Sequence, residues 1–403
     1  MDLIGLSIFL LTYALISIRR KKGYRITRPT AALLGASLMM IFGVITIDEA
    51  ISAIDLNIIF LLIGMMSIVS IFQFTGFFEW IISRIVKFSK TSGRLFILIS
   101  ISTAFFSALF VNDAVVLFFT PIILAISRDN EINPEPFLLS EIFSANIGSV
   151  ATEIGNPQNA YIAIKSSIPF FYYLIKMLPV AIISLIISIL IIYIFYKDTM
   201  NKKLKSYSLE KGIKNKKLFY SATITLVLIL FSFIFERNIA IVPFIGASIL
   251  LFVSPFISDV DPRKIIKEID WGIILFFVGL FIVLEGVLVS GILSEMINVF
   301  NSYGLNLNHP LWYVTFVAVV SNLVSNVPAV MLISPITTGK FWLLLAMSST
   351  LAGNATIIGA AANIIVLEIS SVWGIEISWG RFSKVGIPVT IITILLGTLI
   401  LVF

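Results

Sequence analysis

Long hydrophobic runs separated by short polar segments recur along all 403 residues of the chain. A run of about 20 apolar residues can cross the hydrocarbon core of a bilayer as a helix. The pattern therefore predicts an all-α polytopic membrane protein without a soluble domain. We expect about 10 transmembrane helices, at 3–18, 30–47, 56–74, 137–163, 170–196, 218–235, 239–257, 271–289, 341–368 and 380–403.

Two further apolar stretches carry polar residues at their centres. The stretch 95–127 contains Asn112 and Asp113, and the stretch 311–339 contains Ser325 and Asn326. Most of the arms beside these residues are too short to cross a bilayer at about 1.5 Å per helical residue. Apolar runs of that length suggest re-entrant segments. We therefore predict two helical hairpins, each of which enters the membrane and returns to the same side.

Two of the predicted spans are interrupted by glycine and polar residues. The span 137–163 contains Gly-Asn-Pro-Gln-Asn at 155–159, and the span 341–368 contains a Gly-Asn pair at 353–354. Unsatisfied polar groups inside a bilayer cost several kcal/mol each, so such segments must be surrounded by protein or line a cavity. Both spans are predicted to be broken helices, although a mere structural kink is the simpler alternative.

The two halves of the chain resemble each other. The segment LLGASLMM at 33–40 matches FIGASILL at 244–251, and ATEIG at 151–155 matches ATIIG at 355–359. Each half has five spans and one hairpin, so the second half enters the membrane from the opposite side. Inverted repeats are typical of secondary transporters, whose sites lie near the midplane among broken helices. We predict a first repeat at 1–196, a Lys-rich linker at 197–217 and a second repeat at 218–403.

The net charge of +6 is explained by the distribution of the 28 Lys and Arg residues. If residue 1 lies outside, nearly all of them fall on segments predicted to be inside; the exceptions are Lys165, Lys176, Arg237 and Lys340. This positive-inside pattern predicts a cytoplasmic-membrane protein with both termini outside and a cytoplasmic linker at 197–217. The lipid bilayer accounts for the charge, and nucleic acid is not an expected partner.

Polar residues at the hairpin tips and helix breaks are candidates for a substrate or ion site. A carboxyl group inside a membrane is a functional hypothesis by default, which singles out Asp113 and Glu153, although Asp113 could instead only cap a helix. Freed carbonyls at half-helix C-termini suit Na⁺ or H⁺, and half-helix N-termini suit anions. The predicted site residues are Asn112, Asp113, Thr152, Glu153, Gly155, Asn156, Pro157, Gln158, Asn159, Ser325, Asn326, Asn354, Thr356 and Asn363.

The two halves of this site are not equivalent, because both acids belong to the first half. We expect Na⁺ or H⁺ as the coupling ion, with no other cofactor, and we place a Na⁺ ion near Asn112, Asp113, Gly155 and Asn156. No Arg or Lys falls at mid-depth, so an anion would be held by helix N-termini and by amide or hydroxyl donors. Whether Glu285 takes part in a proton path is left open.

Enzyme chemistry is not expected. The chain has no cysteine and a single histidine, His309, which precedes Pro310 in a predicted outside loop. It contains neither a His-Glu-x-x-His nor a Gly-x-Ser-x-Gly motif. There is also no ATP-binding loop, so transport would be driven by a gradient or by a separate ATPase subunit.

The motifs resemble those of the ion transporter superfamily, which groups arsenical-pump membrane proteins, divalent anion:sodium symporters, citrate transporters and one class of sodium/proton antiporters. Asn-Asp at 112–113, Gly-Asn-Pro-Gln-Asn at 155–159 and Ser-Asn-Val-Pro at 325–328 are most similar to arsenical-pump-like anion permeases of prokaryotes. The hairpin tips depart from the Ser-Asn-Thr pattern of the sodium-coupled dicarboxylate branch. The resemblance implies a site formed by two hairpins and two broken helices, a homodimer, and elevator-type movement.

Two functions follow as hypotheses. The first is a secondary transporter that moves a small anion or an arsenite-like metalloid, coupled to H⁺ or Na⁺, by alternating access. The second is a Na⁺/H⁺ antiporter, which the two deep acids and the missing mid-depth base favour.

Overall fold

The computed structural model describes residues 3–17, 27–204, 212–235, 238–291, 294–295, 298, 302 and 306–403. The predicted inside residues at 19–25, the linker residues 205–211 and Arg237 lie outside the described residues. Within the described part every regular element is a helix, and one isolated bridge joins Thr91 to Lys203. The chain is therefore an all-α polytopic membrane protein, as its hydrophobic pattern predicts.

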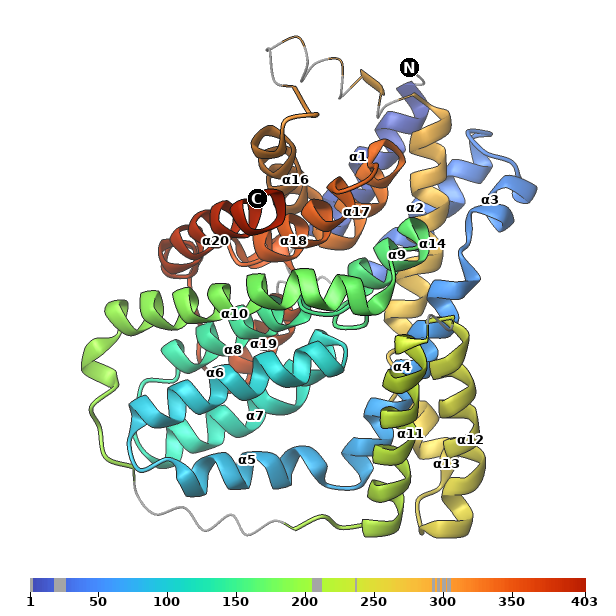
Figure 1. The fold of residues 1–403 in the computed structure, drawn as a ribbon. Helices are drawn as coiled ribbons and strands as arrows, with labels where there is room; N and C mark the ends of the chain where they lie inside the picture. Colours follow the sequence, from blue (N-terminus) through green and yellow to red (C-terminus); the bar gives the residue numbers. More distant parts are fainter. Residues whose placement is uncertain are drawn as a thin grey trace.

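The helices form two groups that run at a steep angle to each other (Figure 1). We call the first group the upright bundle; α14 packs against α2 in it, and α12 packs against α4. The short helices α3 and α13 directly precede α4 and α14. The bundle comprises α1 (Leu3–Ser17), α2 (Arg28–Ile41), α3 (Ile47–Ala53), α4 (Leu56–Phe74), α11 (Lys216–Ile234), α12 (Ile241–Ile257), α13 (Pro262–Lys267) and α14 (Trp271–Val289).

The second group, which we call the stack, contains both hairpins and both broken helices. Its first half consists of α6 (Ser92–Leu109), α7 (Asn112–Asp129), α8 (Glu135–Ser149), α9 (Pro157–Ser166) and α10 (Phe170–Phe195), followed by the turn η1 (Lys197–Thr199). Its second half consists of α16 (Pro310–Val324), α17 (Asn326–Ile333), η2 (Ser334–Ile336), α18 (Phe341–Ala352), η3 (Ile357–Gly359), α19 (Ala361–Val372) and α20 (Trp379–Val402). The long helices α10 and α20 pack against each other and join the two halves.

The predicted hairpins and breaks correspond to elements of the structure. The helices α6 and α7 form the first hairpin, and α16 and α17 form the second. The break of the first span lies between Ser149 and Pro157, where Asn156 caps α9 and Pro157 takes the first helical position, in which a missing N–H costs nothing. The division into inverted repeats at 1–196 and 218–403 stays a prediction, which the matching order of elements supports.

Two details of the sequence prediction are wrong. Helix α2 ends at Ile41 rather than at residue 47, because Gly43 adopts φ +69° and Thr46 then caps α3. Helix α5 (Phe77–Phe88) was not expected at all, since Glu79 and Lys87 make the segment too polar for a span. It is amphipathic, and its buried face includes Phe78 and Ile82.

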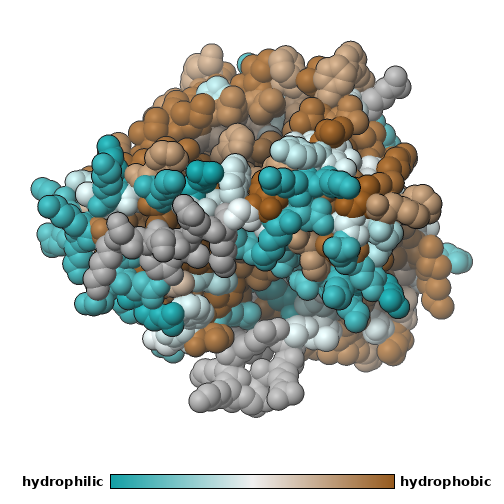
Figure 2. Space-filling model, turned by 90° about the horizontal axis from the view of Figure 1, so that it is seen from below, coloured by the Kyte–Doolittle hydropathy of each residue, from teal (hydrophilic) through white to brown (hydrophobic). Residues whose placement is uncertain are grey.

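The outer surfaces of the long helices are apolar. Among the described residues six helices are long and apolar enough to cross a membrane, and several shorter apolar helices accompany them. Phe231 of α11, Phe252 of α12 and Leu190 of α10 are all more than half exposed, as lipid-facing residues would be. Figure 2 shows hydrophilic residues across the middle of one end of the molecule, with hydrophobic residues above them and along the right edge.

Close backbone packing brings the first hairpin against the first broken helix. A Cβ atom on Gly148 of α8 would lie 2.1 Å from the backbone oxygen of Ala104 of α6. No side chain fits at that distance, so glycine allows α6 and α8 to touch. The contact places the hairpin tip beside the helix break.

Candidate functional site

Each helix break is closed by an asparagine side chain that reaches back to the preceding helix. Asn159 Nδ2 donates to the backbone oxygens of Ser149 at 2.9 Å and Thr152 at 3.2 Å. In the second half Asn363 Nδ2 donates to the backbone oxygens of Gly353 at 2.7 Å and Thr356 at 3.0 Å. The donor and both acceptors are shifted by the same number of residues. The two breaks are therefore built in the same way, and carbonyls freed at the ends of α8 and α18 are satisfied.

The hairpin tips dock onto these breaks, again in equivalent positions. The backbone N–H of Asn112 donates to the oxygen of Gly155 at 2.9 Å. The side-chain amide of Asn326 is oriented so that its nitrogen donates to the backbone oxygen of Gly359. Its oxygen then accepts from Gln158 Nε2 at 3.2 Å. Each tip is thus fixed to the break of its own half, and the second tip also contacts the first break.

A central network joins the two halves. Asn146 Nδ2 donates to Asn354 Oδ1 at 2.9 Å and to Asn363 Oδ1 at 3.0 Å, and its Oδ1 accepts from Asn112 Nδ2 at 3.3 Å. Asn146 is fully buried and was not among the predicted site residues. Its position within the same polar stretch as Glu153 was the only signal in the sequence.

Thr350 occupies the equivalent position in the second half and makes weaker contacts. Its hydroxyl lies 3.3 Å from Gln158 Nε2, 3.4 Å from Asn156 Nδ2 and 3.4 Å from Asn159 Oδ1. Asn146 of the first half and Thr350 of the second half thus each contact the helix break of the other half. Polar groups that lack water are thereby mostly satisfied by protein, as a membrane site requires.

A cavity of about 1270 Å³ ends at these tips and breaks. It opens between the upright bundle, which contributes α1, α2 and α14, and the stack, which contributes both hairpin tips, α19 and the start of α20. Of the predicted site residues, those that line it are Asn112, Asp113, Pro157, Gln158, Ser325 and Asn326. The others lie behind the wall, namely Thr152, Glu153, Gly155, Asn156, Asn159, Asn354, Thr356 and Asn363.

Asp113 is the acidic residue at the tip of the first hairpin, and it lies near the N-terminus of α19 and the basic residue Arg28. Its side chain is 8% exposed, and its carboxyl group interacts with the backbone N–H of Ala362 in the first turn of α19. At longer range it is attracted by Arg28 and repelled by Asp270, both of which line the cavity from the upright bundle. The sequence analysis counted Arg28 only among the basic residues of the predicted inside segments, whereas the fold places it in the lining of the cavity.

Glu153, the second predicted acid, has different surroundings. It is fully buried, and neither of its carboxyl oxygens has a hydrogen-bond partner in the part of the chain that the structure describes. Its electrostatic neighbour is Tyr173 of α10, whose hydroxyl has no partner among these residues either. Glu153 therefore lies behind the break, away from the cavity that Asp113 faces. Glu285 is half-buried on α14 and does not line this cavity.

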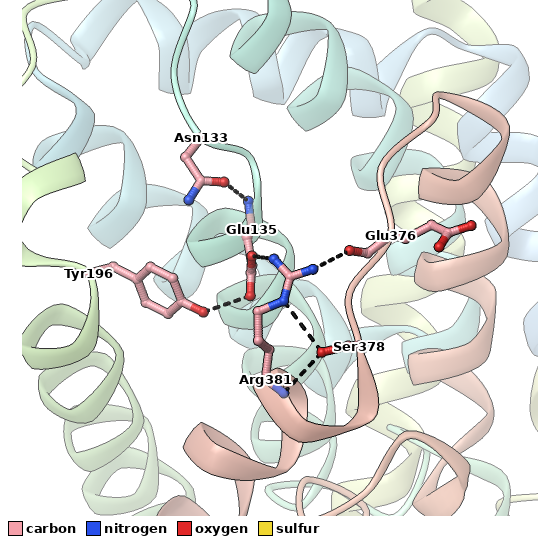
Figure 3. Close-up of polar contacts among 6 residues, drawn as sticks. All are labelled: Asn133, Glu135, Tyr196, Glu376, Ser378 and Arg381. Atoms are coloured by element: carbon pink, nitrogen blue, oxygen red, sulfur yellow. Dashed lines mark hydrogen bonds and ion pairs between the residues drawn. The ribbon is translucent and has the colours of Figure 1, made fainter.

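The mouth of the cavity carries an ion pair that the sequence analysis did not identify (Figure 3). Arg381 of α20 binds Glu135 of α8 at 2.7 Å, and the hydroxyl of Tyr196 donates to the other carboxyl oxygen of Glu135 at 2.9 Å. Arg381 Nη2 also donates to the backbone oxygen of Glu376 at 2.9 Å. This cluster ties the start of α8, the end of α10 and the start of α20 together beside the opening.

Helices of membrane-spanning length, two re-entrant hairpins and a cavity that ends at two helix breaks define a polytopic membrane transporter rather than an enzyme. The family model "Citrate transporter" matches residues 13–341, and the chain belongs to this family of the ion transporter superfamily. The chain is 31% identical to a "46 kDa membrane protein" of Mycobacterium leprae, over 98% of this chain and 97% of the relative. It is 30% identical to the silicon efflux transporter LSI3 of Oryza sativa subsp. japonica, over 85% of each chain.

A solved structure shares the fold. The crystal structure of the Alcanivorax borkumensis YdaH transporter matches with a TM-score of 0.55 at 12% identity and covers 99% of this chain and 96% of its own. At that identity the likeness concerns the arrangement of helices alone.

Proposed function

We propose that the protein is a secondary active transporter that moves a small anion or an arsenite-like metalloid across the cytoplasmic membrane, coupled to H⁺ or Na⁺. The observation that carries this proposal is the convergence of Asp113 and the N-terminus of α9 at the closed end of the cavity. The first turn of α9 presents Pro157 and Gln158 to the same cavity that Asn112 and Asp113 line. A helix N-terminus carries partial positive charge and donors suited to an anion or to the oxygens of a hydroxylated metalloid.

Asp113 and Asn112 are the proposed site of the coupling ion. Asn112 Oδ1 is buried and has no hydrogen-bond partner among the described residues, and the adjacent residue at the cavity end carries the Asp113 carboxyl group. A carboxyl oxygen next to an unpaired amide oxygen suits a proton or Na⁺, both of which require oxygen ligands. The two ions differ in the number of oxygens they need, so flux measurements decide between them.

Alternating access by movement of the stack against the upright bundle is the proposed mechanism. The cavity separates the two groups at the end where α2, α14 and α20 begin. At the opposite end of the molecule from the cavity opening, where α4 begins, the two groups meet. There α4 packs against α9, and Asp55 Oδ2 binds Lys165 Nζ at 2.9 Å. A cavity open at one end and closed at the other is what an inward-facing transporter requires if the N-terminus lies outside.

The orientation and the assembly are parts of the same proposal. The ion pairs Asp55–Lys165, Glu79–Lys214 and Glu135–Arg381 each join segments that the charge pattern places on the same side. This agreement supports the predicted order of the spans, whereas the choice of both termini outside rests on the positive-inside charge pattern. A homodimer rests on the family resemblance, and a separate ATPase subunit, as an alternative source of energy, rests on the missing ATP-binding loop in the sequence.

The experiment is flux into proteoliposomes under imposed Na⁺ and pH gradients, with arsenite, silicate, sulfate, phosphate, citrate and succinate as substrates. We expect gradient-driven flux of one substrate and its loss in Asp113→Asn, which removes the charge but keeps the size. Glu49→Gln, a change in the cap of α3 outside the membrane core, serves as control and should transport normally. Full coupled flux in Asp113→Asn would refute the role of this residue.

A Na⁺/H⁺ antiporter is the second candidate, and the placement of Asp113 opposite Arg28 favours it. An attraction between these groups would help to expel a cation from Asp113 on the side where the cavity opens. Exchange of Na⁺ for H⁺ in the same liposomes, without flux of any of the six substrates, would replace the first proposal by this one.

A further inference from the structure

Glu141 of α8 is a fully buried carboxyl group that belongs to no part of the site described above. It does not line the cavity. Its only hydrogen-bond partner among the described residues is the hydroxyl of Thr120 on α7, at 2.8 Å from Oε1, and its Oε2 has no partner. Among the residues that the structure describes, no Lys or Arg is paired with Glu141.

The contacts of Thr120 restrict where the hydrogens can lie. Its oxygen lies 2.8 Å from Glu141 Oε1 and 2.6 Å from the backbone oxygen of Val116. A hydroxyl group has one hydrogen, and a backbone carbonyl can only accept. If Thr120 donates to Val116, the second contact is a hydrogen bond only when Glu141 is protonated and donates to Thr120. The ionised form would leave one of these two contacts without a hydrogen, with the charge held by a single hydrogen bond in a buried site.

The polar residues nearest to Glu141 along α8 are Ser140 and Ser144. Ser140 bonds Ser100 of α6, which donates in turn to the backbone oxygen of Phe96 at 2.7 Å. Neither pair offers a charge to the carboxyl group. The titratable groups on the helices that pack against α8 are Arg94 on α6, Asp113, Arg128 and Asp129 on α7, Tyr172, Tyr173, Lys176 and Tyr193 on α10, and Glu368 on α19, whereas α18 has none.

We propose that Glu141 is a buried proton-binding residue, which as a neutral acid donates to Thr120 and so fixes α7 against α8. Thr120 and Asp113 are seven residues apart on α7, about two turns and roughly 10 Å along the same helix face. The bond therefore sets the rotation of the hairpin arm that carries Asp113. Glu141 is a positioning residue in this proposal, and it is distinct from the coupling site at the cavity end.

Infrared spectroscopy of the purified full-length protein in lipid tests the bound proton directly. We expect the carbonyl stretch of a protonated carboxylic acid at neutral pH, sensitive to exchange into D₂O, and the loss of that component in Glu141→Gln. Asp113→Asn and Glu153→Gln identify any contributions of the other buried acids, and Glu49→Gln should leave the band unchanged. A spectrum of Glu141→Gln that retains every component of the wild-type acid band would overturn the proposal.

Thr120→Val provides a second measurement that does not depend on a change at Glu141. Without its acceptor the acid would lose the hydrogen bond, and we expect its carbonyl band to shift to higher frequency. An unshifted band would mean that the proton is not donated to Thr120, and the proposal would fail even if Glu141→Gln did not fold.

Transport supplies the functional arm, which rests on the proposed function. Glu141→Gln keeps a donor for Thr120 and should retain at least half of the wild-type flux, whereas Glu141→Leu, which has no donor, should lose at least tenfold. Equal flux in the two variants would show that the bond does not position Asp113. The infrared result is independent of flux, so failure of the transport assignment would leave the proton site testable.

Discussion

Asn146→Ala is the change that tests most directly how the two halves are held together. The substitution removes three hydrogen bonds, those with Asn112, Asn354 and Asn363, all of which are buried. Each partner atom then lacks a partner in a site without water. An orphaned buried group costs about 1–3 kcal/mol in soluble proteins.

The expected magnitude is smaller because the protein is embedded in lipid. Double-mutant cycles in a membrane protein average about 0.6 kcal/mol per hydrogen bond, since the unfolded chain in the membrane also finds partners. Three bonds at that value give about 2 kcal/mol, and we predict a loss of about 2–3 kcal/mol because the orphaned groups are fully buried.

The assay is reversible unfolding of the purified protein in mixed micelles, followed by the change in helix content. Asn57→Ala is the matched control, because Asn57 is exposed at the start of α4 and its side chain donates to Asp55 beside it rather than to a distant segment. Thr350→Val should cost less than about 1 kcal/mol, since its contacts of 3.3–3.4 Å are weaker. A free energy of unfolding for Asn146→Ala within about 0.5 kcal/mol of Asn57→Ala would refute the reasoning.

Three further predictions concern the site and the topology. Pro157→Ala should weaken substrate affinity measured by flux, because it restores an N–H where the break presents its first turn to the cavity; unchanged affinity would reduce the break to a kink. In the cysteine-free chain, Ser52→Cys should react with impermeant reagents added outside and Tyr207→Cys with those added inside, and the reverse pattern would overturn the orientation. Lys165→Met breaks the partly exposed ion pair with Asp55, which contributes up to about 1 kcal/mol to the closed state. The rate at which an impermeant reagent labels Ser334→Cys from outside should therefore rise by up to about fivefold. An unchanged rate would show that the ion pair does not hold the outer end closed.

Much of the architecture follows from the sequence alone. Apolar runs of spanning length predict the long helices, and polar residues at the middle of shorter runs predict the hairpins, because a bilayer penalises any unsatisfied polar group. The order of hairpin and broken helix in both halves could be predicted for the same reason. The amphipathic helix α5 was missed because its apolar positions alternate with charges and resemble a loop on a hydropathy scale.

Only the tertiary structure decides which of the polar residues face the cavity. Asp113 and Glu153 are both deep acids in the sequence, yet one lies at the cavity end and the other lies behind the break next to Tyr173. Hydrophobic periodicity cannot separate them, because both lie in short polar interruptions of apolar runs. The difference arises from the direction in which the broken helix turns between α8 and α9.

The partners across the two halves were likewise beyond the reach of the sequence. Arg28 lines the same cavity as Asp113, and Asn146 bonds Asn354 and Asn363, although these segments are far apart in the chain. Local pattern determines that a polar group in a membrane must be satisfied, but it does not determine by which partner. That choice depends on how helices such as α8 and α19 pack together in the folded protein.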